Sequence, residues 1–359
     1  MKILFLAPAN SIHTVRWVNE LSKKNEVLLV SLSNHKVQDD IIEPRVKIKY
    51  LPISGIMGYY FNALILRHIV AKFVPDIVHV HYASGYGTLA RVSHIPKIVL
   101  SVWGSDVYDF PYHNRLCMKL IQKNLHYASY IISTSKAMGI QVEKIYPQVK
   151  CIDIVPFGVD IHKFKYNQKK GENNKFIFCV VKSQEDIYGI DVIVKSFSFF
   201  LRKIKNDKQK IELHIYGKGT KEEQLKRLSI EEKCEDHVKW KGYVKNTCLP
   251  EILSEADVFC VGSRKESFGV STVEAMAAGV PVLATETDGA KEIIINTVTG
   301  LRVKQEAVEE MSKEMRFLYD NVEKRRAMGK AGRDRVEEFY NWEKNVETML
   351  KIYKKITEE

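Results

Sequence analysis

A chain of 359 residues is long enough for two domains, each with its own hydrophobic core. Its 45% hydrophobic and 28% charged residues are typical of soluble globular proteins. The net charge of +11 is concentrated in residues 1–165, which hold 20 Lys and Arg against 11 Asp and Glu. This excess indicates an anionic partner, such as a membrane surface, a phosphate-bearing substrate or nucleic acid, unless it reflects only a Lys-rich composition. No nucleic-acid-binding motif accompanies it, so we expect no nucleic-acid partner.

The six cysteines are scattered, with no C-x-x-C pair, which is typical of small core residues in a reducing compartment. No apolar run reaches membrane-spanning length, and the apolar segment at residues 3–9 is too short for a signal-peptide core. We therefore expect a cytoplasmic protein that does not cross a membrane.

The first half of the chain alternates apolar strands with helical patterns. Residues 2–8, K-I-L-F-L-A-P, predict the first strand of a parallel sheet, and residues 15–24 predict a helix. Further strands are predicted at residues 26–31, 46–52, 76–81, 97–103 and 130–135, with a helix at 135–146. The loop after the first strand lies at the ligand edge of such a sheet, which makes Asn10 and His13 candidate acceptor contacts. His13 could equally cap the helix start.

Residues 54–73 predict one apolar, aromatic helix that also carries Arg67, His68 and Lys72. Such a helix could lie in a membrane interface, or it could be a buried crossover helix, which is the commoner case. His79 and His81 alternate with Val, so both point to one sheet face. A core role is favoured for them over metal binding, because no further ligand lies at metal-site spacing.

The second half begins after residues 165–175, whose polar composition indicates a linker. Strands are predicted at residues 176–181, 212–216, 238–244, 258–261 and 280–284, and helices at 190–201, 249–256, 270–278, 333–339 and 342–356. Residues 287–293 are expected to form a ligand-edge loop before a helix. The bare G-K-G at residues 217–219 does not support a dinucleotide fingerprint.

The most informative stretch runs from Ser263 to Pro281, between two strands of that half. Glu266 and Glu274 flank the predicted helix start, and carboxylates there can hold the paired hydroxyls of a sugar or ribose. Backbone N–H groups near Phe268, Gly269 and Val270 would face a phosphate at the helix N-terminus. In the alternative, Ser271 and Glu274 form a capping box and Glu266 is a solvated loop residue.

The segment E-S-F-G-V-S-T-V-E-A-M-A-A-G-V-P, from Glu266 to Pro281, resembles the signature of retaining glycosyltransferase family 4, the glycosyl transferases of group 1. S-I-H-T-V-R-W near the N-terminus and V-P-F-G-V-D at residues 155–160 are also similar to family segments. The resemblance implies an α/β protein of the GT-B fold, with two Rossmann-like domains whose parallel sheets face each other across a cleft. We expect an acceptor-side domain at residues 1–165, on which a terminal helix at 342–359 packs, and a nucleotide-sugar domain at 166–341.

The resemblance also implies roles for single residues in donor binding. Glu266 would hold the transferred sugar and Glu274 the donor ribose. The family carries G-R-x(5)-K-G before the first helix of its second domain, and here Lys182 stands at the Arg and Tyr188 at the Lys. Lys182 can neutralise phosphate as a point charge, whereas Tyr188 donates one hydrogen bond without charge. Arg264 or Lys218 is expected to supply the missing cation.

On the acceptor side, the family usually carries His where Trp103 stands, in an H-G-x-D context. Asp106 then becomes the candidate polar group, and the expected catalytic set is Glu266, Lys182 and Asp106. Trp103 stays an acceptor-side candidate.

The expected function is transfer of a sugar, with retention, from a nucleotide-diphosphate sugar to a glycan or lipid-linked acceptor in cell-surface polysaccharide synthesis. No cofactor or metal is expected, since the chain contains no D-x-D. The basic first half predicts attraction to the anionic inner face of a membrane. Two alternatives are a non-catalytic protein that keeps the fold, which Trp103 and Tyr188 suggest, and a Rossmann-domain dehydrogenase, against which the missing G-x-G-x-x-G argues.

Overall fold

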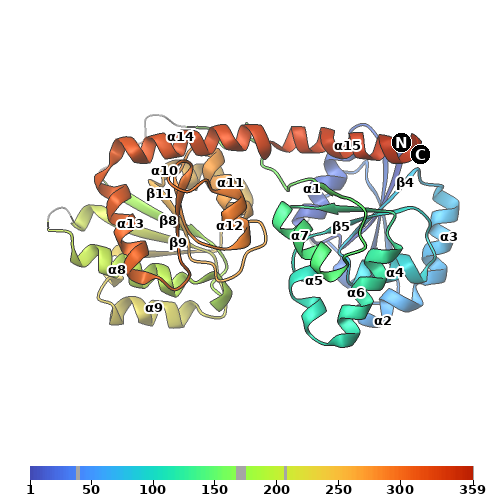
Figure 1. Cartoon of the computed structure of the whole chain (residues 1–359), viewed down its shortest axis with the longest axis horizontal. Helices are drawn as coiled ribbons and strands as arrows, with labels where there is room; N and C mark the ends of the chain where they lie inside the picture. The colour runs from blue at the N-terminus through green and yellow to red at the C-terminus, as the bar shows by residue number, and fades with distance from the viewer. Residues whose placement is uncertain (38–40, 167–174, 206–207, 359) are drawn as a thin grey trace. The chain divides into compact units, whose positions relative to one another are not determined.

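The computed structural model describes residues 1–37, 41–166, 175–205 and 208–358. By backbone contacts the chain divides into two compact units, Met1–Phe157 with Lys344–Glu359, and Gly158–Glu343 (Figure 1). The sequence predicts boundaries near these, after residues 165 and 341. Most of the predicted linker, residues 167–174, lies outside the described residues.

The first unit contains a parallel sheet of seven described strands in the order β3-β2-β1-β4-β5-β6-β7. The strands are β1 (Lys2–Leu6), β2 (Glu26–Leu32), β3 (Lys47–Leu51), β4 (Ile77–His81), β5 (Ile98–Val102), β6 (Tyr130–Ser133) and β7 (Ile152–Ile154). The strand order reverses direction between β1 and β4. Loops that follow these two strands therefore border the crevice where open α/β sheets bind ligands.

Helices cover both faces of this sheet (Figure 1). They are α1 (Ile12–Leu21), α2 (Gly55–Phe61), α3 (Ala63–Phe73), α4 (Gly85–Val92), α5 (Ser105–Tyr108), α6 (Arg115–Tyr127) and α7 (Lys136–Ile145), with 3-10 helices η1 (Ser33–His35) and η2 (Phe110–Tyr112). The last helix, α15 (Trp342–Glu358), returns to this unit from residue 344 onward.

Strand β4, I-V-H-V-H, illustrates how alternation directs side chains to the two faces. Val78 and Val80 join the hydrophobic core that α3, α4 and α6 complete. His79 and His81 point to the other face, where a ring nitrogen of His79 pairs with the Tyr353 hydroxyl of α15. Both histidines are fully buried, which confirms the expected core role.

The second unit contains a parallel sheet of six described strands in the order β10-β9-β8-β11-β12-β13. The strands are β8 (Phe176–Val181), β9 (Ile211–Tyr216), β10 (Val238–Gly242), β11 (Val258–Val261), β12 (Val282–Thr285) and β13 (Gly300–Val303). Here the order reverses between β8 and β11. The loops after these two strands carry the G-R-x(5)-K-G-like segment and the E-S-F-G segment, so both lie at the expected ligand edge.

The helices of the second unit are α8 (Ile190–Arg202), α9 (Glu222–Glu231), α10 (Leu249–Glu255), α11 (Val270–Ala277), α12 (Asp288–Ile293), α13 (Val308–Asp320) and α14 (Val322–Phe339), with 3-10 helices η3 (Asp186–Tyr188), η4 (Lys208–Lys210), η5 (Glu235–His237) and η6 (Asn246–Cys248). The long apolar face of α8 packs on β8, where Phe197 and Phe200 contact Phe178. Two parallel-sheet units of this kind confirm the predicted α/β class.

Two predicted elements differ in kind from the structure, and the helix predicted at residues 333–339 begins earlier, at Val322 of α14. The single helix expected at residues 54–73 is two helices, because the buried Asn62 amide donates to the carbonyl oxygens of Ile53 and Gly58 and ends α2 there. The loop expected at 287–293 is the short helix α12, capped by the Thr287 hydroxyl. Among the described residues, no helix is both long and apolar enough to cross a membrane.

Candidate functional site

The loops after β8 and β11 lie backbone to backbone in the second unit. Gly189 has a left-handed φ of 55°, and a Cβ placed on it would lie 2.0 Å from the Gly262 carbonyl oxygen. A Cβ on Gly262 would lie 2.2 Å from the Gly189 carbonyl oxygen. The N–H of Arg264 donates to the carbonyl oxygen of Ile187 at 2.8 Å, which ties the loops together. Glycine is thus required at both positions for this close approach.

Three predicted donor-site residues meet where these loops converge. The Lys182 ammonium donates to one carboxylate oxygen of Glu266, and the Ser263 hydroxyl donates to the other at 3.1 Å. Both charged side chains are only 13% exposed. The Tyr188 ring lies over the ammonium, with 5.0 Å between Lys182 Nζ and the ring centroid. The structure therefore assembles one small polar site from residues 84 positions apart.

The N-terminus of α11 borders the same site. Gly269 precedes the helix with a φ of 110°, and a Cβ on it would lie 3.6 Å from the carboxyl carbon of Glu266. N–H groups in the first turn of a helix have no acceptor within the helix, so they and the positive helix end favour an anion. Phe268 is buried, and the Gly289 N–H donates to the Glu266 carbonyl oxygen at 2.9 Å, which fixes this loop against α12. The predicted phosphate contact at Phe268, Gly269 and Val270 stays a prediction, and the geometry suits it.

Glu274 lies in the second turn of α11, where its side chain is partly buried. The capping-box alternative does not fit, because Gly269 occupies the N-cap and Ser271 is the second residue of the helix. The buried Ser271 hydroxyl has no hydrogen-bond partner among the described residues. The ribose contact of Glu274 stays a prediction.

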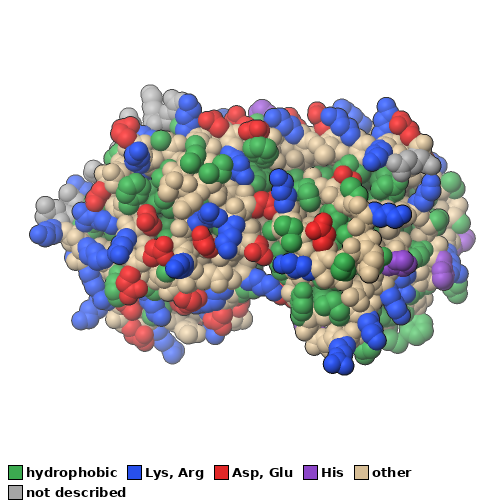
Figure 2. Space-filling view, in the orientation of Figure 1, with side chains coloured by type: hydrophobic (Ala, Val, Ile, Leu, Met, Phe, Trp, Pro, Cys, Tyr) green, Lys and Arg blue, Asp and Glu red, His purple; other side chains and the backbone are tan. Residues whose placement is uncertain are grey.

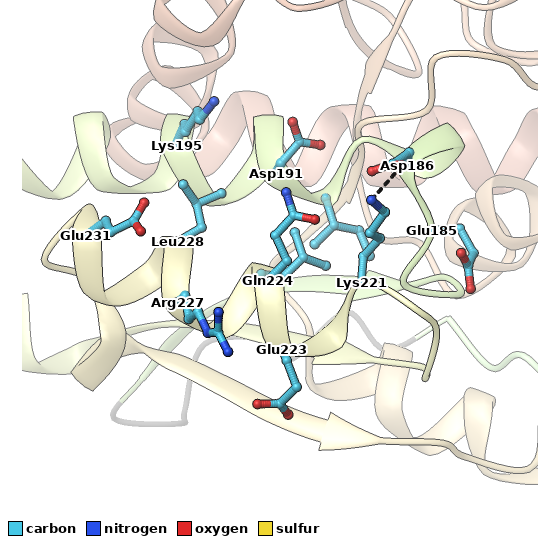
Figure 3. Close-up of a pocket in the computed structure, with 12 residues that line it drawn as sticks. Glu185, Asp186, Asp191, Lys195, Lys221, Glu223, Gln224, Arg227, Leu228 and Glu231 are labelled. Atoms are coloured by element: carbon cyan, nitrogen blue, oxygen red, sulfur yellow. Dashed lines mark ion pairs between the residues drawn. The ribbon is translucent and has the colours of Figure 1, made fainter.

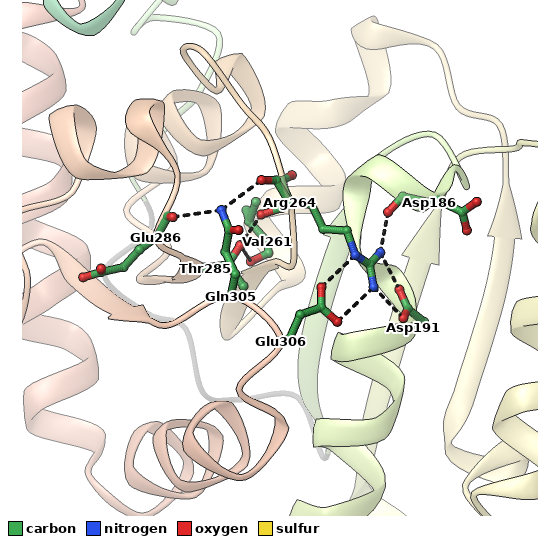
Figure 4. A network of polar contacts seen from close by, with 9 residues as sticks. Asp186, Asp191, Val261, Arg264, Thr285, Glu286, Gln305 and Glu306 are labelled. Atoms are coloured by element: carbon green, nitrogen blue, oxygen red, sulfur yellow. Dashed lines mark hydrogen bonds and ion pairs between the residues drawn. The ribbon is translucent and has the colours of Figure 1, made fainter.

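Arg264 does not join this site but lies in a network of carboxylates (Figure 4). Its guanidinium pairs with Asp191 through two bonds of 3.0 and 2.8 Å and with Glu306 through two bonds of 2.7 and 3.1 Å. It also donates to the carbonyl oxygen of Asp186. Because arginine has five N–H donors, no donor remains for a diphosphate. The expectation that Arg264 binds the donor thus has no support in this geometry, which gives it a structural role.

Lys218, the other expected cation, comes from the loop after β9. This loop packs directly on the Lys182 loop, since a Cβ on Gly217 would lie 1.9 Å from the Lys182 carbonyl oxygen. The Lys218 side chain is exposed and forms no ion pair with the residues that the structure describes. Lys218 therefore remains the better candidate for a second cation.

In the first unit, His13 lies in an aromatic cluster at the ligand edge of the sheet. Its ring stacks on Phe157, with 3.9 Å between centroids, and meets the edge of Trp103. Burial, and secondarily the charge of Arg16, lowers the pKa of His13 to about 4, so the ring is neutral at pH 7. Its Nδ1 is buried without a partner among the described residues. The N-cap of α1 is Ser11, so His13 is not the helix cap, and its acceptor contact stays a prediction.

Trp103 fills the centre of this cluster. Its ring centroid lies 4.1 Å from that of His81 and 5.1 Å from that of Tyr82. Only 8% of the residue is exposed, so its aromatic surface serves mainly to pack the cluster. Asn10, the other expected acceptor contact, has an exposed side chain next to this helix start, and its N–H donates to the carbonyl oxygen of His35.

Asp106 is buried beneath the Trp103 loop, with 1% of the residue exposed. Its carboxylate accepts hydrogen bonds from the N–H groups of Ala83, Trp103 and Gly104 at 2.8, 3.1 and 2.9 Å. Burial raises the pKa of Asp106, although these backbone donors act against the shift. A carboxylate so enclosed positions the loop, and the expected catalytic role of Asp106 has no support in this geometry.

A separate pocket of about 450 Å³ lies between α8 and α9 (Figure 3). It is lined mainly by charged side chains of both signs, and an ion pair between Lys221 and Asp186 crosses one end at 3.0 Å. None of the donor-site residues Lys182, Glu266 and Gly269 lines it. The described residues contain no group of three or more His, Cys, Asp or Glu that could hold a metal ion. The expectation that catalysis needs no metal stays a prediction.

The sequence did not reveal the parts played by Ser263 and Phe157. Ser263 stands three positions before Glu266, and only the folded loop shows that its hydroxyl bonds the carboxylate. Phe157 stands where the family segment V-P-N-G-V-D has Asn, so an aromatic residue at that position was the available signal.

Two family models match most of the chain. Glycosyl transferases group 1 matches residues 162–335, and Glycosyl transferase 4-like matches residues 2–135. The two matches correspond to the second and first units.

Similar proteins agree with these matches. The uncharacterized glycosyltransferase MJ1069 of Methanocaldococcus jannaschii is 26% identical over 331 residues, which are 90% of this chain and 76% of that protein. The sucrose-phosphate synthase of Thermosynechococcus elongatus superposes with a TM-score of 0.84 at 18% identity, covering 99% of this chain and 98% of that one. Anabaena Alr3699/HepE in complex with UDP superposes with a TM-score of 0.82 at 14% identity, covering 99% and 100%. These likenesses show the GT-B fold that the signature implied.

Proposed function

Since this chain belongs to the glycosyl transferases of group 1, we propose that it moves a hexosyl group from a nucleoside-diphosphate sugar to an acceptor hydroxyl with retention of configuration. The observation that carries the proposal is the meeting of Lys182, Glu266 and the N-terminus of α11 at the ligand edge of the second unit. One cation and a helix end suit a diphosphate, and a carboxylate beside them suits sugar hydroxyls. The UDP bound by Alr3699/HepE gives further support for a nucleotide ligand.

In this mechanism the bond between the anomeric carbon and the phosphate oxygen breaks while the acceptor oxygen bonds to the same face of that carbon. The leaving phosphate oxygen takes the acceptor proton, so no separate base is required. Lys182 and the N–H groups at the start of α11 stabilise the negative charge that develops on the diphosphate. Lys182 is already in place but paired with Glu266, so donor binding must bring the phosphate within reach of the same ammonium.

The acceptor is proposed to be a glycan or lipid-linked glycan of the cell surface, presented at the inner face of a membrane. The positive excess of residues 1–165 supports an anionic surface as its location. The neutral His13 and the aromatic rings around it suit an incoming sugar, since aromatic surfaces pack on apolar ring faces.

A panel of nucleotide sugars, tested by thermal shift and then for transfer, examines the proposal. A specific donor should raise the melting temperature, because it binds the folded state only. Transfer or slow donor hydrolysis should then follow with that donor. Stabilisation without any turnover would favour a non-catalytic nucleotide-sugar-binding protein. No stabilisation by any nucleotide sugar or nucleoside diphosphate would contradict the proposal.

The variant Lys182→Ala tests the part of the proposal that concerns the phosphate. It should nearly abolish transfer, because no positive charge then remains at this position to pair with the donor diphosphate. The variant Tyr188→Lys should be tolerated. The partly exposed Lys195 of α8 offers a control, since Lys195→Ala removes a lysine from the same unit outside the proposed site. Normal turnover by Lys182→Ala would remove this lysine from the mechanism.

A further inference from the structure

Helices α2 and α3 expose an unusual number of large apolar side chains. We call the α2–α3 face the set of Ile56, Met57, Tyr60, Phe61, Leu64 and Ile65. Their exposed fractions range from 39% at Ile65 to 78% at Ile56. Single exposed apolar residues are common on proteins, but six within ten positions form a patch of the kind that marks an interaction site.

The patch is a built surface and not the outside of a loose segment. Within α2 a spacing of four residues places Ile56 beside Tyr60 and Met57 beside Phe61, and Leu64 and Ile65 stand together at the start of α3. The opposite side is packed, since Leu66 is fully buried and a Cβ on Gly58 would lie 2.2 Å from the Ile53 carbonyl oxygen. The side-chain amide of Asn62, between α2 and α3, donates hydrogen bonds to the carbonyl oxygens of Ile53 and Gly58, and these bonds hold the junction of the two helices in place.

The charge around this face is positive. Arg67, His68 and Lys72 follow on exposed positions of α3. Between Glu43 and Asp106 the sequence contains a single acidic residue, Asp76, against seven Lys and Arg. Figure 2 shows hydrophobic side chains over the α2 region, with Lys, Arg and His side chains nearby.

We propose that the α2–α3 face docks on an anionic lipid bilayer, with its apolar side chains in the headgroup–acyl boundary and its basic residues at lipid phosphates. An apolar helical surface flanked by Lys and Arg is the composition that binds such interfaces. A second copy of this face is a poor occupant, because a symmetric contact would bring like charges together. The proposal deepens the proposed function, on which it rests for the purpose of reaching a membrane-bound acceptor.

Flotation with lipid vesicles tests the proposal. At low salt, the full chain should float with equimolar phosphatidylcholine and phosphatidylglycerol vesicles, but not with phosphatidylcholine alone. The double variant Ile56→Glu with Leu64→Glu should bind the anionic vesicles about tenfold more weakly or worse, since it removes apolar contact and adds negative charge. Raising salt should weaken binding by the intact protein, because screening shortens electrostatic attraction to within about 10 Å at 0.1 M.

Ile230→Glu is the matched control. Ile230 is 59% exposed in α9, close to the 61% of Phe61, but no other large apolar side chain of this helix is exposed beside it. This variant should bind anionic vesicles as the intact protein does. The melting temperature of each variant shows that it is folded.

Three results would overturn the proposal: equal vesicle binding by the double variant and the intact protein, no binding by the intact protein at low salt, or a dimer in solution that the double variant dissociates. The rise in melting temperature caused by a nucleotide sugar, measured on the same samples, distinguishes failure of the membrane proposal from failure of the proposed transferase function. Its persistence in a protein that ignores vesicles would leave the donor site intact and discard only the membrane face.

Discussion

Glu266 is the residue at which the donor-site contacts converge, and its carboxylate can be tested without a change in shape. We expect Glu266→Gln to reduce turnover about 10- to 100-fold, the effect of losing one charged hydrogen bond to the transferred sugar. Nucleoside-diphosphate affinity should change little, because Lys182 keeps its charge and loses only a partner. Steady-state kinetics and calorimetric titration with the nucleoside diphosphate measure the two quantities.

Glu286→Gln is a suitable comparison for that variant. Glu286 is a partly exposed carboxylate of the same unit whose nearest cation, Lys291, lies 3.9 Å away. Its substitution should leave both turnover and affinity unchanged. Normal turnover by Glu266→Gln would exclude Glu266 from the sugar site.

Glu274→Ala separates ligand binding from helix stability. If the carboxylate holds the ribose diol, nucleotide binding should weaken by ~1–3 kcal/mol. The first turn of α11 should stay intact in this variant, because the N-cap is Gly269 and Ser271 does not form a capping box with Glu274. Nucleotide affinity and melting temperature decide the matter together. A lower melting temperature with normal affinity would assign Glu274 to structure alone.

Among the loops, the contact between Gly189 and Gly262 is the feature that places Lys182 beside Glu266. Gly262→Ala would bring a Cβ within 2.2 Å of the Gly189 carbonyl oxygen, so the two loops would have to separate. We expect a loss of stability of ~1–3 kcal/mol, as for overpacking, and weaker nucleotide binding. Chemical denaturation and calorimetric titration measure the two effects.

Gly139→Ala is the corresponding control. Gly139 lies inside α7, where a Cβ would meet no atom closer than the flexible Ile154 Cδ1 at 3.4 Å. Replacing a helical glycine by alanine is expected to stabilise by ~0.5–1 kcal/mol. If Gly262→Ala behaves like this control, the close approach of the two loops is not needed for the site.

These elements also show which parts of the fold can be predicted from the sequence. The strands that precede the donor loops, β8 and β11, are continuous apolar runs, such as F-I-F-C-V-V at β8, and they were predicted at their observed bounds. The short edge strands β7 and β13 were missed, since I-D-I and G-L-R-V carry little periodic signal. The break at Asn62 was missed because the apolar pattern continues across it, and only the folded side chain reveals the cap.

Site residues could be predicted from the sequence where their role follows from their own position after a strand. They could not be predicted where the role depends on partners far away in the sequence. Lys182 and Glu266 follow strands and were expected at one edge, where the structure brings them into contact. Arg264 was expected at the donor because Tyr188 leaves the family's second phosphate cation missing. Its carboxylate partners, Asp191 and Glu306, are 73 and 42 positions away, so no pattern in the sequence indicates that its N–H donors are already used.

At the scale of the whole chain, the last helix, α15, belongs to the first unit from residue 344 onward. The Tyr353 hydroxyl pairs with His79 Nδ1, and the Ser101 hydroxyl pairs with His79 Nε2 at 2.6 Å. The same sheet face holds His81 and, at its edge, His13. Burial lowers the pKa of all three imidazoles, to about 4 for His13, to about 3 for His79 and well below 6.5 for His81.

These lowered pKa values make the free energy of unfolding depend on pH. Above pH 6.5 the three rings are neutral in both the folded and the unfolded chain, so they impose no penalty. As the pH falls below 6.5, the unfolded chain takes up protons that the folded chain cannot bind until pH about 4 at His13 and about 3 at His79. Each such group therefore lowers the free energy of unfolding by about 1.4 kcal/mol per pH unit.

We expect urea denaturation between pH 6.5 and 5 to show a steep loss of stability as the pH falls. His81→Gln should make the slope shallower by about 1.4 kcal/mol per pH unit, because glutamine cannot take up the proton in the unfolded chain. His214 in the second unit provides the comparison, since burial also lowers its pKa but a 2.7 Å bond to Glu212 opposes the shift. His214→Gln should change the slope less. An unchanged slope in His81→Gln would show that this histidine can be protonated inside the fold, and that the buried imidazoles do not make the first unit acid-labile.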